Sequence, residues 1–176
     1  MTNDLTDNVG RIFDAHARAL VLYARQWLDD GRARDAVQEA FVRLLRREDA
    51  PPNTLAWLYR TVRSAAIDNL RSDQRRQRRE REVASGRSMW FEPRPEDAID
   101  AAAAQTALAT VLEKQREVIV LRLWSGLTLA EIAEVCQVSV STVFSRYRAG
   151  LAAVRKRLEQ TSTTCDNVHP GLGPRS

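Results

Sequence analysis

Apolar side chains recur every three or four residues along most of the chain, which is the spacing of one face of an α-helix. One stripe runs from Phe13 to Leu28, and we expect Gly31 to end that helix. A second stripe, Val37–Leu45, stops before two consecutive prolines, which cannot continue a helix. A third stripe runs from Leu55 to Leu70. The first part of the chain is therefore predicted to hold three helices.

The helical period is lost over residues 83–97, which contain a glycine and two prolines, and it resumes at Ala98. Helices are predicted over 98–112, 114–124 and 128–136, with a last helix that begins after Ser139. We expect this last helix to turn Val143, Tyr147, Leu151, Val154 and Leu158 inward. The predicted fold class is all-α, with two small helical domains over residues 1–82 and 98–160, a flexible linker over 83–97 and a disordered tail over 161–176.

Local signals mark several helix ends. Asn53 or Thr54 can cap the third helix, since both side chains accept a hydrogen bond from a first-turn backbone N–H. Thr128 and Glu131 have the spacing of a capping box. Gln137 and Val138 form the tight turn that follows.

Two helices joined by so short a turn have the geometry of a helix-turn-helix. The second helix carries short hydroxyls and arginines opposite its apolar stripe, which suits base edges and phosphates in a major groove. These residues are Ser141, Thr142, Ser145, Arg146 and Arg148. Phe144, in the same row, either touches a thymine methyl or extends the core. The alternative is a plain helical hairpin with a solvated arginine face.

Charge is distributed unevenly although the net charge is only +4. Six arginines lie within residues 71–81, a second basic zone covers 142–158, and acidic residues gather over 92–100. Two basic zones on one chain predict a polyanion that is contacted at two places. The two cysteines and two histidines are too few and too scattered for a metal site, so no metal or cofactor is expected. The absence of a long apolar run and of a signal peptide predicts a cytoplasmic protein without membrane insertion.

The sequence resembles a known family in two separate places. QREVIVLR (115–122), GLTLAEIA (126–133) and STVFSR (141–146) resemble region four of bacterial sigma factors. DAVQEAFVRL (35–44), AWLYRTVR (56–63) and AIDNLR (66–71) resemble region two. Both sets occur in the family's order with no third domain between them, as in the extracytoplasmic-function (ECF) group of the sigma-70 family.

The resemblance implies roles for individual residues. The helix from Asp35 would dock on core RNA polymerase through Asp35, Gln38, Glu39 and Arg43. The loop that includes Asn53 would capture a flipped base of the minus-ten element. The following helix would contact and melt that element, with candidate contacts at Arg60, Arg63, Asn69, Arg71, Arg75 and Arg76. Trp57 and Tyr59 either stack on unpaired bases or belong to the core.

The resulting hypothesis is a sigma factor that binds core RNA polymerase and directs promoter recognition, DNA melting and transcription initiation. The resemblance also implies an anti-sigma protein as a partner, because the family often has one. Two residues depart from the family pattern. Ser64 stands where relatives often have Asn. Gln137 stands where they have a turn glycine, at a position that favours a left-handed backbone. The rivals are a helix-turn-helix regulator that acts on duplex operators without polymerase, a helical scaffold held by a partner protein, and an enzyme. No catalytic constellation at usable spacing supports the last of these.

Overall fold

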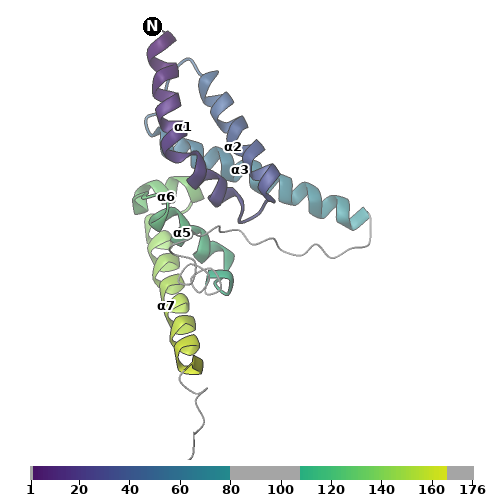
Figure 1. Ribbon diagram of the computed structural model, residues 1–176, viewed down its shortest axis with the longest axis vertical. Helices are drawn as coiled ribbons and strands as arrows, with labels where there is room; N and C mark the ends of the chain where they lie inside the picture. Colours follow the sequence, from purple (N-terminus) through teal and green to yellow (C-terminus); the bar gives the residue numbers. More distant parts are fainter. Residues whose placement is uncertain (1, 80–107, 166–176) are drawn as a thin grey trace, which may run out of the picture.

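The computed structural model describes residues 2–79 and 108–165, and all regular secondary structure in these ranges is helical (Figure 1). The N-terminal half contains α1 (Thr2–Ala24), α2 (Asp30–Leu45) and α3 (Thr54–Arg79). The C-terminal half contains α5 (Glu113–Leu123), α6 (Leu129–Cys136) and α7 (Val140–Cys165). The predicted all-α class is confirmed. The predicted linker, residues 83–97, and most of the helix predicted over 98–112 lie outside the described residues.

In the N-terminal half, α1, α2 and α3 pack against one another around buried side chains that include Leu20, Val37 and Leu58. The prediction that Gly31 ends the first helix is wrong. That helix ends at Ala24, and Gly31 lies in the first turn of α2. The reason is local, because the Asp29 carboxylate accepts a hydrogen bond from the backbone N–H of Arg32 at 2.9 Å and so starts α2 before the glycine.

The start of α3 follows the predicted capping. The Asn53 side-chain oxygen accepts a hydrogen bond from the backbone N–H of Ala56 at 3.0 Å. This bond satisfies a first-turn donor that has no partner within the helix. Asn53 is therefore held at the point where the loop from α2 enters α3, and its amide orientation is set by the helix.

In the C-terminal half, α5, α6 and α7 pack together. The last helix continues to Cys165, so the disordered tail predicted from residue 161 is wrong for 161–165, and residues 166–176 lie outside the described part. The inward stripe predicted for this helix is also only partly right. Val143 is buried, but Leu151 and Leu158 are each 38% exposed, because α7 extends past the packed helices (Figure 1).

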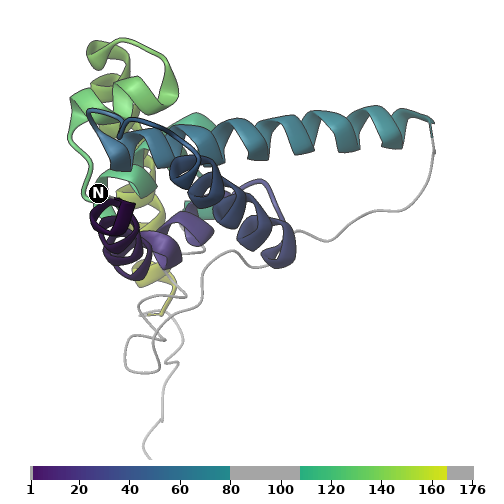
Figure 2. The same cartoon turned by 90° about the horizontal axis from the view of Figure 1, so that it is seen from above.

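The two halves are packed against each other rather than held only by the chain between them. One cluster of buried apolar residues includes Tyr23 and Val62 of the N-terminal half with Val118 and Ile132 of the C-terminal half. Helix α3 lies against α6, and α1 lies against α5. Beyond these contacts the far end of α3 projects away from the packed helices (Figure 2). Within the described ranges, no helix has the length and apolarity needed to cross a membrane.

Candidate nucleic-acid interface

The α6–α7 unit has the predicted helix-turn-helix construction. Thr128 and Glu131 form a complete capping box, in which the Thr128 backbone N–H donates to Glu131 Oε2 at 2.7 Å and the Glu131 N–H donates to Thr128 Oγ1 at 3.3 Å. The turn contains Gln137 in the left-handed region, with φ 55°. Ser139 Oγ then accepts from the Thr142 N–H at 3.2 Å and caps α7. Local sequence chemistry thus fixes the angle at which α7 leaves the turn.

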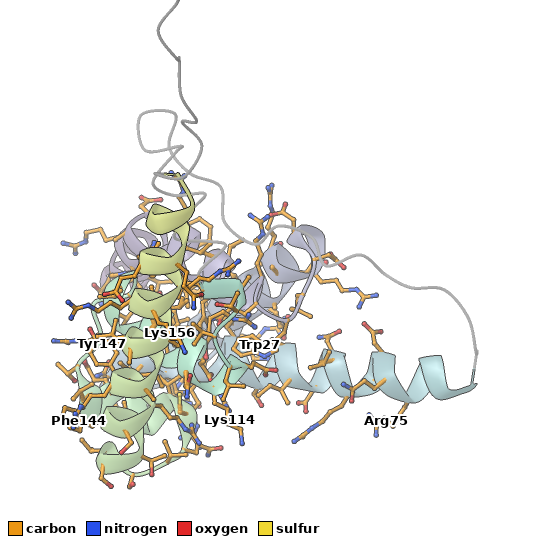
Figure 3. All side chains as sticks on the ribbon, turned by 90° about the horizontal axis from the view of Figure 1, so that it is seen from below. Trp27, Arg75, Lys114, Phe144, Tyr147 and Lys156 are labelled. Carbon is orange, nitrogen blue, oxygen red and sulfur yellow. The ribbon has the colours of Figure 1, made fainter. Side chains whose placement is uncertain are left out.

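The outer row at the start of α7 is open to solvent. Ser141, Phe144, Ser145 and Arg148 are exposed. Phe144, labelled in Figure 3, is 48% exposed, so it does not extend the core. The Arg148 guanidinium lies 5.7 Å from the centroid of its ring. A guanidinium beside an aromatic face is held by cation–π attraction. The row therefore presents an apolar ring and an oriented cation next to two hydroxyls.

Thr142 and Arg146 are less open than the rest of this row, since both are half-buried. The Thr142 hydroxyl lies 2.8 Å from that of Ser139 in the cap. The Arg146 charge acts on Cys136 of α6. The pKa of the Cys136 thiol is raised to about 12, chiefly by burial and next by the charge of Glu117, while the charges of Arg63 and Arg146 act to lower it. Among the two arginines predicted on this surface, Arg148 is the more accessible.

The candidate minus-ten residues on α3 fall into two groups. Arg60, Asn69, Arg71 and Arg75 are exposed, and Arg75 lies on the projecting part of the helix (Figure 3). Asn69 Nδ2 donates to the backbone oxygen of Ala65 at 2.9 Å, and Arg71 pairs loosely with Asp68 at 3.7 Å. Arg76 belongs to α3, but its side chain lies outside the described part. This group forms an open basic arm.

The other group, Asn53 and Arg63, contacts the C-terminal half. Asn53 Nδ2 donates to Glu131 Oε1 at 2.7 Å. Arg63 Nε donates to Glu117 Oε1 at 2.6 Å. Tyr59 is completely buried and belongs to the core, whereas Trp57 is half-buried with the Arg47 guanidinium 5.5 Å from its ring.

Sequence reasoning missed the group that Arg63 contacts. Glu117 is a buried carboxylate, and its Oε1 also accepts from the Tyr23 hydroxyl at 2.8 Å. Burial raises the pKa of Tyr23 well above its usual value, and the Glu117 charge raises it further. The only signal in the sequence was a carboxylate directly before the apolar run Val118–Leu121. Nothing local indicated its partners.

The polymerase-binding candidates lie in one exposed row of α2. Asp35, Gln38, Glu39 and Arg43 are all exposed, opposite the buried Val37 and Phe41. Arg43 Nε and Glu39 Oε1 form an ion pair at 2.9 Å. Over residues 2–79 and 108–165, no group of three His, Cys, Asp or Glu side chains is arranged to hold a metal ion.

A helix-turn-helix with an open outer row, joined to a helical bundle with a basic arm, defines a DNA-binding protein. The family model described as "Sigma-70 region 2" matches residues 12–76, and "Sigma-70, region 4" matches 101–154. The chain is 32% identical to the ECF RNA polymerase sigma factor SigW of Bacillus subtilis over 140 residues, which cover 72% of this chain and 75% of SigW. It is 29% identical to SigL of Mycobacterium tuberculosis over 87% of this chain and 90% of SigL. The chain belongs to the ECF RNA polymerase sigma factors.

Two solved structures share its fold. The sigma factor RpoE, in complex with the anti-sigma factor NepR from Bartonella quintana, matches with a TM-score of 0.73 and 21% identity, over 89% of this chain and 97% of RpoE. CnrH, in complex with the cytosolic domain of CnrY, matches with a TM-score of 0.62 and 23% identity, over 90% of this chain and 92% of CnrH.

Proposed function

We propose that the chain is a transcription initiation factor that binds core RNA polymerase and directs it to promoters. Membership of the ECF sigma factors supports this function, and one observation carries it. The same chain presents three exposed polar surfaces, on α2, on α3 and on α7, as a protein that contacts both polymerase and two promoter elements requires. The polymerase supplies the chemistry, so the chain itself needs no catalytic residue, metal or cofactor. Its place of action is the cytoplasm, where polymerase and promoter DNA are.

The minus-thirty-five element is assigned to the outer row of α7. Ser141 and Ser145 offer hydroxyls, and Arg148 offers a guanidinium that can bond a guanine edge with two hydrogen bonds. The exposed Phe144 ring suits a thymine methyl. A sequence containing both a thymine and a guanine on one strand fits the Phe144–Arg148 pair.

The minus-ten element is assigned to α3 and to the loop before it. Arg71 and Arg75 on the open arm suit backbone phosphates, and Asn53 suits the edge of an extruded base. Opening the duplex would draw its free energy from binding unpaired bases and single-strand phosphates.

Core polymerase is assigned to the exposed row of α2, and this assignment gives the decisive test. We expect Glu39→Lys to weaken binding to core polymerase about tenfold, since reversing a charge at an interface juxtaposes like charges. Asp14→Lys, which makes the same change of charge on an exposed position of α1, is the matched control. Affinity is measured by fluorescence anisotropy of the labelled full chain, and transcription from a genomic promoter library follows with the same proteins.

The competing function is a helix-turn-helix regulator that acts on duplex operators without polymerase. The open α7 row alone would also serve that function. Tight, sequence-specific duplex binding by the chain alone, unchanged when core polymerase is added, would overturn the sigma-factor proposal and favour the regulator.

We also propose an anti-sigma partner, because the structurally similar sigma factor RpoE is bound by the anti-sigma factor NepR, and CnrH is likewise in complex with a second protein. Purification of the tagged full chain from its own cells should yield a second protein in equal amount. That protein should block binding of the chain to core polymerase in the anisotropy assay.

A further inference from the structure

Two residues assigned to the minus-ten element make polar contacts with the other half. Asn53 bonds Glu131 of α6 and Arg63 bonds Glu117 of α5. Two further bonds cross the same interface, from the Tyr23 hydroxyl to Glu117 Oε1 at 2.8 Å and from Trp27 Nε1 to Glu113 Oε1 at 2.7 Å. In each of these contacts the C-terminal half provides a carboxylate and the N-terminal half provides the donor.

Both functional groups of the Asn53 amide are engaged. Its oxygen caps α3 by accepting from Ala56 N–H, which leaves the NH₂ group for recognition. That NH₂ group donates to Glu131 Oε1 at 2.7 Å, while Glu131 Oε2 accepts from Thr128 in the capping box. The amide cannot turn over to free its donor without losing the cap of α3. Glu131 thus takes one of the two N–H donors of this group, and a base edge that uses the same donor competes with Glu131 for it.

Arg63 is held in the same way at a more buried position. Glu117 is only 2% exposed and accepts from both Arg63 and Tyr23 through one oxygen. Burial lowers the pKa of Arg63, but the hydrogen bond to Glu117 and its charge outweigh burial and raise it overall. Arg63 thus remains a cation and donates to a carboxylate, and guanidinium groups bind carboxylates and phosphates in similar ways.

We propose that the C-terminal half is an internal competitor for the minus-ten strand. Glu131 and Glu117 occupy Asn53 and Arg63 in place of a base edge and a phosphate, and the two halves must separate before that strand binds. The proposal rests on the proposed function, which assigns both residues to the minus-ten element. When only a fraction of molecules is open, the apparent affinity for the strand falls by that fraction.

Glu131→Gln tests the competition with little change to the fold. Glutamine is accepted at this position of a capping box, so its oxygen can remain on Thr128. Its NH₂ group then faces the Asn53 NH₂ group, and two donors cannot bond each other. The matched control is Glu134→Gln, which removes the same charge from an exposed position of the same helix. Thermal melts by circular dichroism check that both variants are folded.

The assay is fluorescence anisotropy of the full chain with a fluorescein-labelled single-stranded oligonucleotide of random sequence, about 20 nucleotides long. Loss of a negative charge strengthens DNA binding by itself, and the Glu134→Gln variant measures that general effect. We expect Glu131→Gln to bind about three- to tenfold more tightly than Glu134→Gln, as a larger open fraction requires. Adding Asn53→Ala should remove most of this gain.

Equal affinities of the two glutamine variants would overturn the proposal, and so would a gain that Asn53→Ala leaves intact. Binding to core polymerase separates these outcomes from a failure of the proposed function. If Glu131→Gln binds core as the unaltered chain does but gains no affinity for the strand, the competitor is wrong and the sigma factor stands. If the unaltered chain does not bind core, the proposed function fails whatever the oligonucleotide shows.

Discussion

The surfaces assigned to the two promoter elements differ in their availability. On α7, Ser141, Phe144, Ser145 and Arg148 face solvent and can meet a duplex without rearrangement. Asn53, directly before α3, and Arg63 of α3 are held by carboxylates of the other half, whereas Arg60 between them is exposed. The far end of the same helix is open, and Arg75 lies on it (Figures 2 and 3). The difference arises from tertiary packing, because the partners that hold Asn53 and Arg63 lie on α6 and α5 of the other half.

On the proposed assignments, this contrast gives an order of events on promoter DNA. The exposed row of α7 and the open part of α3 would contact duplex DNA first. Capture of an extruded base by Asn53 would follow, because the base competes with Glu131 for the Asn53 amide. The carboxylate contacts would thereby separate reading of the duplex from reading of the single strand.

The largest expected effect comes from removing the buried carboxylate of the interface. Glu117→Ala leaves Arg63 and the Tyr23 hydroxyl without their partner in a poorly solvated place. We expect a loss of about 3 kcal/mol in the free energy of unfolding, the lower end of the range for breaking a buried ion pair. Urea unfolding followed by circular dichroism measures it. The double variant Glu117→Ala, Arg63→Ala should lose less than the sum of the single changes, and strict additivity would show that the pair contributes nothing.

Local structure was predictable from the sequence where its cause lies within a few residues. Asn53 as a cap, the Thr128–Glu131 capping box and left-handed Gln137 all depend on interactions between near neighbours. Gly31 was misread because glycine is a common helix terminator, and the competing Asp29 cap was overlooked. Leu151 and Leu158 are exposed because the neighbouring helices end before them. The apolar period of α7 alone does not indicate where those neighbours end.

The sequence predicts which polar residues belong to the candidate surfaces, but it does not predict which of them are bonded to the other half of the molecule. The exposure of the polar row of α2 follows from its position opposite an apolar stripe. Phe144 is exposed, as contact with a thymine methyl would require and membership of the core would not. The pairing of Tyr23 with Glu117 spans 94 positions of sequence, and that of Asn53 with Glu131 spans 78. A contact at such separation is set by how the two halves pack, so it leaves no pattern in either segment.

A second prediction concerns the open surface. Arg148→Ala should reduce transcription that depends on the minus-thirty-five element about tenfold, which corresponds to about 1.4 kcal/mol. Arg146→Ala should reduce it less, because Arg146 is half-buried beside α6. Transcription in vitro with core polymerase measures both, and scrambling the minus-thirty-five element should abolish the difference from the unaltered chain. A larger effect of Arg146→Ala would mean that α7 docks on a different face.

A third prediction concerns the turn between α6 and α7. Helix α6 carries Glu131, which holds Asn53, and α7 carries the exposed recognition row. Gln137 has φ 55°, a conformation that costs a side chain about 1 kcal/mol and costs glycine nothing. Gln137→Gly should therefore raise the free energy of unfolding by up to about 1 kcal/mol. Gly126→Ala is the matched opposite change, because Gly126 has φ 67° with open space around it, and it should destabilise by about the same amount. Stabilisation by both substitutions would exclude backbone strain as the cause.

The smallest expected effect is a dependence of the closed interface on pH. Hydrogen bonds from the Thr128 side chain and backbone, with a further bond from Asn53, lower the pKa of Glu131 below its usual value of 4.5. A carboxyl whose pKa is lower in the folded state stabilises that state above its unfolded pKa, and the stabilisation is lost as the pH falls through the lowered value. Acid should therefore release Asn53, and the protection of backbone amides in the first turns of α3 and α6, taken relative to the intrinsic exchange rate at each pH, should fall below about pH 4.5. Other carboxyls titrate in the same range, so the comparison that isolates Glu131 is with Glu131→Gln, whose protection should be lower at neutral pH and fall less on acidification. An identical acid response in the two proteins would show that Glu131 does not hold the halves together, and the contrast between the two DNA surfaces would then depend on Glu117 alone.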